Sequence, residues 1–197
     1  MGFTEAILDE KDPGKIHKYA EKVFDRSKHM ASIILNMSGY MRSAMSTEEK
    51  EINLNEKIDA AIEIAILTSY NNDIKLDKNF SEVPPIKAKS EEIQQIFINL
   101  LTNAVQAMEG KGELRISTIG ENGNVRAIIR DTGPGIPKEY LSKIYDPFFT
   151  TKEQGRGTGL GLNIVHQLVV KYGGKIDVSS QEGEGTTFSL TFPASQI

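Results

Sequence analysis

The sequence predicts an α+β protein, a two-layer α/β sandwich in which helices cover one face of a mixed β-sheet. Two observations lead to this fold class. Helical and strand-like segments alternate from about residue 49 to the end of the chain. In the last strand-like segment two faces alternate, one formed by Thr186, Phe188, Leu190 and Phe192 and the other by Thr187, Ser189 and Thr191. Because one face is apolar and the other is wetter, we expect helices on a single side of the sheet.

A long heptad helix is predicted ahead of this domain. Asp12-Pro13 fits an N-cap followed by proline at the first helical position. Apolar and small residues then recur at alternating steps of four and three, at Ile16, Ala20, Val23, Ser27, Met30, Ile34, Met37, Met41 and Ala44. This seam predicts a helix from Asp12 to Ser46 that packs against partner helices, with a core helix of a single domain as the alternative. The segment SAMSTEEKE breaks the pattern, so we divide the chain into residues 1–48 and 49–197.

Hydrophobic periodicity predicts the elements of the second region in order. We expect a short strand and a helix in INLNEKIDAAIEIAI, a strand in IKLDKNF, and a connection in SEVPPIKAKS, where Ser90 can cap the next helix. That helix is the amphipathic segment SEEIQQIFINLLTNAVQAM. Two hairpins follow, one around ENGN and one around EGEG, with a helix between them.

The composition excludes several classes of function. The chain has 197 residues, is 39% apolar and 25% charged, and has a net charge of −4, which does not suggest a nucleic-acid partner. It has no cysteine, which excludes disulfides, thiolate metal sites and cysteine nucleophiles. No apolar run approaches the roughly 20 residues of a membrane span. We therefore expect a cytoplasmic chain without membrane contact, and leave open a membrane anchor in the full-length protein.

Residues 155–161 read GRGTGLG and lead into an apolar helix, which is typical of backbone brought close to phosphate. A P-loop is excluded because no lysine follows these glycines in the required register. A Rossmann turn is excluded because the glycines lie late in the chain and follow a polar segment, not a strand. A different kind of phosphate site is therefore indicated.

Two asparagines, Asn99 and Asn103, lie four residues apart on the amphipathic helix and share one stripe beside its apolar face. Asparagine is a poor helix former, so the pair requires a reason. Solvated residues at the edge of the core are one interpretation. The other is that an amide oxygen binds a hard cation such as Mg²⁺ held by a triphosphate.

Asp131 ends the inward-facing row Val125, Ala127, Ile129 of a predicted strand and begins the segment DTGPGIP. A carboxylate there is costly unless a donor reaches it. Gly133 and Gly135 follow and would let a flat ligand approach the backbone. An acceptor beside glycines suits the exocyclic amino group of a purine, while a simple Asp-Thr-Gly turn is the alternative.

The segment YDPFFTTK places two aromatic residues next to a lysine in a loop. Adjacent aromatics are usually core residues, and we expect one of Phe148 and Phe149 to be buried. Lys152 begins a polar, glycine-rich run that could bring its charge to phosphate.

Five motifs occur in an order and at spacings that resemble the ATP-binding domain of sensor histidine kinases. They read NLLTNAVQA, DTGPGIP, DPFFTTK, GRGTGLGL and GEGTTF, and the resemblance covers residues from about 50 to 193. It implies the two-layer fold of this family and the cofactors ATP and Mg²⁺. In this family GRGTGLG corresponds to the end of a mobile lid over the nucleotide phosphates.

The resemblance also implies roles for individual residues. Asn103 would bind Mg²⁺, Asn99 would help to position water or phosphate, and Lys152 would approach the phosphates as a catalytic residue. Asp131 would accept the adenine amino group. The remaining nucleotide-binding residues would be Gly133 and Gly135 in the pocket, Phe148 and Phe149 as lid anchors, Gly157, Gly159, Leu160 and Gly161 in the lid, and Thr186 near the adenine.

Three functions other than that of a sensor histidine kinase are also compatible with some of these motifs. DNA gyrase, MutL-type repair proteins and a heat-shock chaperone have the same fold and hydrolyse ATP. They carry a general-base glutamate where this chain has Asn99, and an amide cannot take a proton from water at neutral pH. Anti-sigma-factor kinases lack a long heptad helix and DPFFTTK. A degenerate ATP domain that acts only as an interaction module is the third alternative.

Residues 11–42 resemble the second helix of the family's dimerisation and phosphotransfer hairpin. The first helix of that hairpin should carry the motif H-[ED]-x-x-[NT]-P, but His17, His29 and His166 all lie in other contexts. We therefore expect a chain cut inside the hairpin, in which residues 1–11 are a stub of the first helix. The resemblance implies phosphoryl transfer to a histidine outside this chain and then to an aspartate of a response regulator. It also implies self-association through the N-terminal helix.

Overall fold

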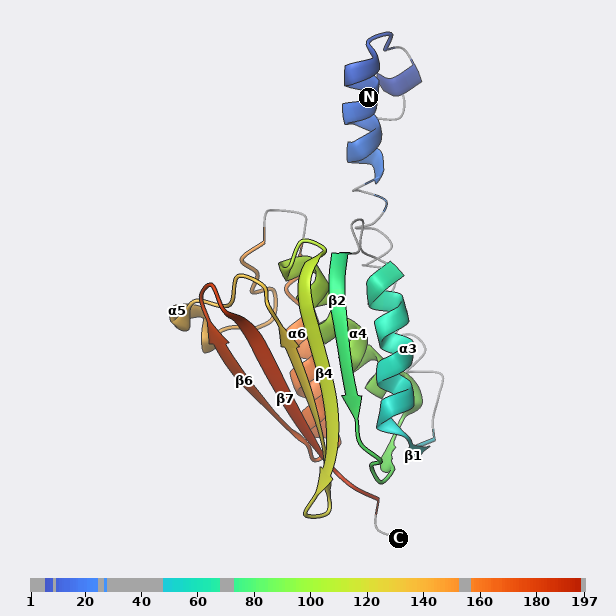
Figure 1. The fold of residues 1–197 in the computed structure, drawn as a ribbon, viewed down its shortest axis with the longest axis vertical. Helices are drawn as coiled ribbons and strands as arrows, with labels where there is room; N and C mark the ends of the chain where they lie inside the picture. Colours follow the sequence, from blue (N-terminus) through green and yellow to red (C-terminus); the bar gives the residue numbers. More distant parts are fainter. Residues whose placement is uncertain are drawn as a thin grey trace.

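Figure 1 shows the computed structural model of the chain, which describes residues 6–8, 10–24, 27, 48–67, 73–152 and 157–195. The elements from residue 50 onward are β1 (Lys50–Ile52), α3 (Leu54–Leu67), β2 (Asp73–Phe80), β3 (Ile86–Ala88), α4 (Ser90–Ala107), β4 (Lys111–Glu121), β5 (Asn124–Asp131), α5 (Lys138–Leu141), α6 (Gly161–Lys171), β6 (Lys175–Gln181) and β7 (Gly185–Pro193). The predicted alternation of helices and strands is confirmed. The short β3 and α5 were not predicted.

The main sheet is mixed, as predicted. Its five strands follow the order β2-β4-β5-β7-β6, and β2 is parallel to β4 while the other pairs are antiparallel. β1 and β3 form a separate antiparallel pair. Both predicted hairpins are present, and Asn122 and Gly123 at the β4–β5 turn have φ of 51° and 72°. These angles are typical of the tight turns that join two antiparallel strands.

The helices pack against one face of the sheet, as Figure 1 shows for α4 and α6 behind the strands. The predicted alternation in β7 is confirmed, since Thr186, Phe188, Leu190 and Phe192 are all buried. They meet the apolar face of α4, whose residues Ile93, Ile96, Phe97, Leu100 and Leu101 are completely or almost completely buried. The core therefore lies between the sheet and α4, with α3 and α6 on either side of that helix.

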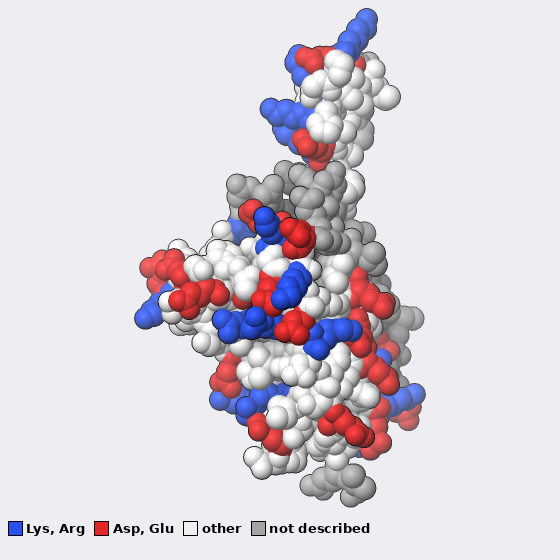
Figure 2. All heavy atoms as spheres, viewed as in Figure 1, with Lys and Arg blue, Asp and Glu red and all other residues white. Residues whose placement is uncertain are grey.

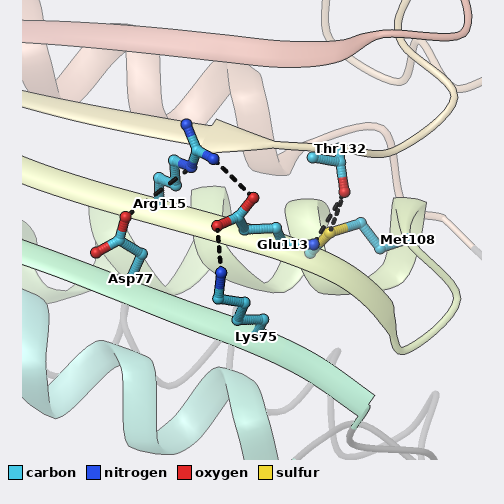
Figure 3. Close-up of polar contacts among 6 residues, drawn as sticks. All are labelled: Lys75, Asp77, Met108, Glu113, Arg115 and Thr132. Atoms are coloured by element: carbon cyan, nitrogen blue, oxygen red, sulfur yellow. Dashed lines mark hydrogen bonds and ion pairs between the residues drawn. The ribbon is translucent and has the colours of Figure 1, made fainter.

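The opposite face of the sheet is polar, and Figure 2 shows basic and acidic side chains mixed across it. Figure 3 shows one network there, in which Glu113 of β4 pairs with Arg115 at 2.8 Å and with Lys75 at 3.4 Å. Arg115 lowers the pKa of Glu113. The Thr132 hydroxyl accepts the Glu113 backbone N–H at 2.9 Å and lies 3.8 Å from the Met108 sulfur at the end of α4. The residue after Asp131 is thereby fixed to both β4 and α4.

The predicted start of the N-terminal helix is confirmed. The Asp12 side chain accepts the Gly14 N–H at 2.8 Å, its carbonyl accepts the Ile16 N–H at 3.0 Å, and residues 13–24 are helical. The seam residues from Met30 to Ala44, and His29, lie outside the described residues. Within the part of the chain that the structure describes, no helix has the length and apolar character needed to cross a bilayer.

The predicted cap of α4 is wrong. Ser90 is the first helical residue, and the N-cap is Lys89, whose side chain makes no capping hydrogen bond. The Lys89 N–H is instead accepted by the Tyr172 hydroxyl at 3.1 Å. A tertiary contact from the end of α6 therefore takes part in fixing the start of α4, and local sequence could not show it.

Candidate functional site

Asp131 lies at the end of β5 and is only 5% exposed. Its Oδ1 accepts the Gly133 N–H at 2.9 Å and the Thr186 N–H at 3.3 Å. Both of these donors reach Oδ1, and the only further backbone donor to the carboxylate among the described residues is the N–H of Asp131 itself. Burial raises the pKa of this carboxyl, although the backbone donors oppose that effect. Asp131 is therefore a buried acceptor with one oxygen fixed by the fold and one oxygen available to a ligand.

Glycines let the β6–β7 hairpin close tightly over this strand end. A Cβ on Gly185, at φ +104°, would lie 2.0 Å from the Asp131 carbonyl oxygen, and one on Gly135, at φ +75°, would lie 2.1 Å from the Gln181 carbonyl oxygen. A Cβ on Gly133 would lie 2.9 Å from Asp131 Oδ1. Gly133 thus borders the carboxylate, whereas Gly135 makes its close contact with the hairpin backbone.

Ser180 of β6 connects this loop with the hairpin. Its hydroxyl accepts the Ile136 N–H at 2.8 Å, donates to the Gly185 carbonyl at 2.9 Å and lies 3.0 Å from the Thr186 hydroxyl. Sequence reasoning missed Ser180. The signal was available, because the hairpin register around EGEG pairs Ser180 with Thr186.

Asn99 and Asn103 both face Gly161, the first residue of α6. Asn99 is 5% exposed, and its Nδ2 donates to the Gly161 carbonyl at 3.4 Å. A Cβ on Gly161 would lie 3.7 Å from Asn103 Nδ2 and 3.8 Å from Asn99 Oδ1. Asn99 is therefore not a solvated residue at the edge of the core. The glycine leaves room between the two amides for a small group.

Lys152 lies against the same stripe of α4. Its Nζ donates to Gln106 Oε1 at 2.6 Å and to Asn103 Oδ1 at 3.4 Å, and burial lowers its pKa. The ammonium group shows that Asn103 Oδ1 is open to a cation. Gln106 was missed, although it lies three residues after Asn103 and so on the same face of the helix.

The loop before α6 packs through backbone contacts. The Phe148 N–H donates to the Gly159 carbonyl at 3.0 Å, and a Cβ on Gly159, at φ +65°, would lie 2.3 Å from the Phe148 carbonyl carbon. The Phe148 side chain is 74% exposed, while Phe149 packs against the core and the Tyr140 ring. The prediction that one of the two aromatics is buried is confirmed only in part, because Phe149 is partly buried against the core. A Cβ on Gly157 would lie 2.6 Å from the Thr150 hydroxyl.

The first turn of α6 offers anion-binding groups. Leu160 is its N-cap residue and accepts the Ile164 N–H at 2.9 Å through its carbonyl. The backbone N–H groups of the first turn have no partner within the helix, and the helix dipole favours an anion there. Since Gly161 borders both asparagines, an anion at this end would lie beside an amide oxygen that can bind its counterion.

Helix α4 links the two parts of the site. A Cβ on Gly133 would lie 3.3 Å from the Ala107 Cβ, and Asn103 and Asn99 lie one and two turns before Ala107 on the same helix. At about 1.5 Å per residue, the amides lie roughly 6 and 12 Å along the helix from the acceptor end. The arrangement suits an elongated ligand with a flat, hydrogen-donating head at Asp131 and an anionic, cation-bound tail at the start of α6.

Residues 88–196 match the family described as histidine kinase-, DNA gyrase B- and HSP90-like ATPase. All predicted site residues, from Asn99 to Thr186, lie inside the matched range.

The individual relatives described here have kinase names. The chain is 32% identical to the sensor histidine kinase ZraS of Escherichia coli strain K12, over 91% of this chain and 38% of that protein. It is 33% identical to sporulation kinase E of Bacillus subtilis, over 99% of this chain and 26% of that protein. The chain thus spans well under half the length of these relatives. The catalytic domain of the histidine kinase ThkA, in a nucleotide-free form, superposes with a TM-score of 0.66 at 34% identity, over 75% of this chain and 96% of that domain.

Proposed function

Because the chain belongs to the histidine kinase-, DNA gyrase B- and HSP90-like ATPase family, as the catalytic ATP-binding domain of a sensor histidine kinase, we propose that it binds Mg·ATP between Asp131 and Asn103. We further propose that it donates the γ-phosphoryl group to a histidine on a dimerisation hairpin. The observation that carries the proposal is the pairing of a buried acceptor with two asparagines along one helix.

At the base end, Asp131 accepts the adenine amino group through the oxygen that the fold leaves available. The other carboxylate oxygen, Oδ1, is held by the backbone N–H groups of Gly133 and Thr186. Because the carboxylate is oriented before the ligand arrives, little of the binding free energy is lost to ordering it. Guanine would present a carbonyl where adenine presents the amino group, so the same carboxylate disfavours GTP.

At the phosphate end, Asn103 would supply a neutral oxygen ligand to Mg²⁺. Bound Mg²⁺ would neutralise charge on the phosphates. Lys152 adds a positive charge once its Nζ leaves Gln106, and the first amides of α6 donate to phosphate oxygens. Asn99 holds the start of α6 through the Gly161 carbonyl. An amide at this position favours phosphoryl transfer over hydrolysis, because it cannot serve as the base that activates water.

In the transfer itself, a histidine ring nitrogen forms the new bond to the γ-phosphorus while the bond to the β–γ bridging oxygen breaks, which yields phosphohistidine and ADP. The rate depends on placing that nitrogen in line with the leaving oxygen. His17 pairs with Glu21 on an exposed helix and His166 contacts the Tyr145 ring, and neither lies in the motif H-[ED]-x-x-[NT]-P, so we propose an acceptor outside this chain. An aspartate of a response regulator would then take the phosphoryl group.

The test combines the chain with γ-labelled ATP and a separately produced hairpin from the same full-length protein. We expect acid-labile, base-stable label on the hairpin when all three are present, and none on the chain alone. Release of free phosphate without protein labelling would support an ATPase instead. Nucleotide binding without transfer would support an interaction module. Label on this chain that disappears when His17 or His29 is replaced would refute the assignment of the acceptor.

A further inference from the structure

Glu92 is the most deeply buried acidic residue of the described chain, at 3% exposure in the first turn of α4. Lys171, the last residue of α6, donates to its two carboxylate oxygens at 2.6 and 2.8 Å. The Tyr172 hydroxyl donates to Oε2 at 2.5 Å and accepts the Lys89 N–H at 3.1 Å. We refer to Glu92, Lys171, Tyr172 and the Lys89 N–H as the Glu92 clasp.

A buried ion pair such as the Glu92 clasp is not needed to stabilise the contact between two helices. Removing a carboxylate from water costs several kcal/mol, and a well-packed apolar pair often serves as well. Elsewhere α6 buries the apolar residues Ile164, Val165 and Val169. Apolar contacts between two helices tolerate small shifts along their axes, whereas charged hydrogen bonds require one register. The clasp therefore specifies how far along α4 the helix α6 lies.

The position of α6 matters at its other end. The two helices run antiparallel, so that the end of α6 meets Glu92 while its start meets Asn99 through the Gly161 carbonyl. Figure 1 shows the two helices packed side by side behind the sheet. A shift of α6 would move Gly161 relative to both asparagines by the same amount. Between α4 and the start of α6 the hydrogen bond is 3.4 Å long, so the shorter hydrogen bonds that join these two helices lie at the clasp.

We propose that Glu92, Lys171 and Tyr172 are positioning residues for the phosphate end of the nucleotide site. By fixing α6 along α4, they set the distance between the amides at the start of α6 and the side chains of Asn99 and Asn103. This proposal rests on the proposed binding of Mg·ATP. It assigns a role in triphosphate binding to residues that lie at the opposite end of α6 from the ligand.

The binding test uses Lys171→Met, Tyr172→Phe and Glu92→Gln, each titrated calorimetrically with Mg·ATP and with adenosine. We expect Mg·ATP to bind about five- to tenfold more weakly, at the lower end of the range for coupling between distant sites, and adenosine affinity to stay within about twofold. Lys171→Arg keeps the charge and should restore most of the loss. Lys78→Met is the matched control, because Lys78 pairs with Asp59 at 2.8 Å between β2 and α3. It should change neither affinity.

A second measurement needs no nucleotide. In proton–nitrogen NMR spectra of the unliganded chain, Lys171→Met and Tyr172→Phe should shift the amide signals of Gly159 and Gly161 and leave those of Gly133 and Gly135 in place. Variants that melt at lower temperature but keep the wild-type ratio of Mg·ATP to adenosine affinity, and the wild-type glycine signals, would overturn the proposal. If the wild-type chain bound no Mg·ATP, the proposed function would fail, and the glycine signals alone would decide whether the clasp positions α6.

Discussion

The two ends of the nucleotide site are built in different ways. At Asp131 the backbone of two strands and a hairpin encloses the carboxylate, and a Cβ on Gly185 would lie 2.0 Å from a backbone oxygen. At Gly161 a Cβ would meet no atom closer than 3.7 Å. The base end is therefore closed by backbone contacts, whereas the junction between α4 and α6 at Gly161 has room for one additional methyl group.

Because of this difference, substitutions at the two ends should affect different properties, either the stability of the fold or the affinity for nucleotide. Changes at the base end that add atoms should damage the fold, because neighbouring backbone cannot move aside. Changes at Gly161 should leave the fold intact and alter the affinity for phosphates, whereas Gly159, which packs on the Phe148 backbone, has no room for added atoms. Each prediction below tests one side of this comparison.

The largest expected effect is that of Gly185→Ala. The added methyl would meet the Asp131 carbonyl at a φ that L residues rarely adopt, so we expect the free energy of unfolding to fall by about 3–5 kcal/mol. Gly183→Ala is the control in the same hairpin, because it has φ +81° but no atom within 4 Å of its Cβ. It should cost only about 1–2 kcal/mol in urea unfolding experiments. Equal losses for both variants would show that the hairpin does not close tightly on Asp131.

The next effect concerns the adenine acceptor. Asp131→Asn keeps the side-chain shape and an oxygen for the Gly133 and Thr186 donors, but places an amide donor or a weaker acceptor against adenine. We expect the binding free energy of ATP to weaken by about 2–4 kcal/mol, or roughly 30- to 1000-fold. Calorimetric titration provides the measurement, and an unchanged affinity for ATP would remove Asp131 from the base site.

The same carboxyl predicts a dependence on pH. Burial raises the pKa of Asp131 in the folded protein, so its ionised form is less favourable there than in the unfolded chain. Its contribution to stability is complete below the unfolded pKa and declines as pH rises through the folded pKa. Thermal unfolding should therefore show wild type gaining stability relative to Asp131→Asn as pH is lowered from 7. A difference in melting temperature that is constant with pH would contradict this.

At the phosphate end, Gly161→Ala places a methyl group between the amides of Asn99 and Asn103 without a clash. The free energy of unfolding should stay within about 0.5 kcal/mol of wild type. Mg·ATP should bind about tenfold more weakly, because the methyl occupies space that phosphate approaches. Adenosine should bind as before, and an equal loss for adenosine would place the glycine near the base instead.

The smallest effect is expected for Lys152→Met. Lys152 is partly exposed and already has Gln106 as a partner, so its charge contributes modestly to phosphate binding. We expect Mg·ATP affinity to fall about three- to fivefold and AMP affinity to stay unchanged. Fluorescence competition with both nucleotides gives the ratio, and the matched variant Gln106→Leu, which frees the Lys152 ammonium, should not weaken ATP binding. Equal losses of ATP and AMP affinity in Lys152→Met would argue against a contact with the outer phosphates.

Much of the base end could be predicted from sequence because it depends on strand periodicity. Asp131 continues the buried row of β5, and Thr186 begins the buried row of β7, so the pleat itself placed the two side chains together. The sequence-predicted pair Asn99 and Asn103 also lies as helical spacing requires. In both cases the neighbouring residue can be predicted, either from the periodicity of side chains along one helix or strand or from the pairing of two strands.

The contacts that sequence did not predict join elements that are distant in the chain. Lys171 and Glu92 are 79 residues apart, and no local pattern indicates that α6 ends beside the start of α4. The wrong cap at Ser90 has a similar cause, since the N-cap residue is Lys89 and its backbone N–H is held by the distant Tyr172 hydroxyl. Strand β3 was missed because its partner β1 is a three-residue strand, too short to show alternation.

The most direct test of the central claim is a calorimetric comparison of ATP with GTP on the wild-type chain, both with saturating Mg²⁺. The two ligands share the triphosphate and differ at the base, so the comparison isolates the contact with Asp131. We predict that ATP binds at least about tenfold more tightly, because the guanine carbonyl would face the buried carboxylate. Equal affinities for ATP and GTP would contradict the assignment of Asp131 as the adenine acceptor and with it the proposed orientation of the nucleotide along α4.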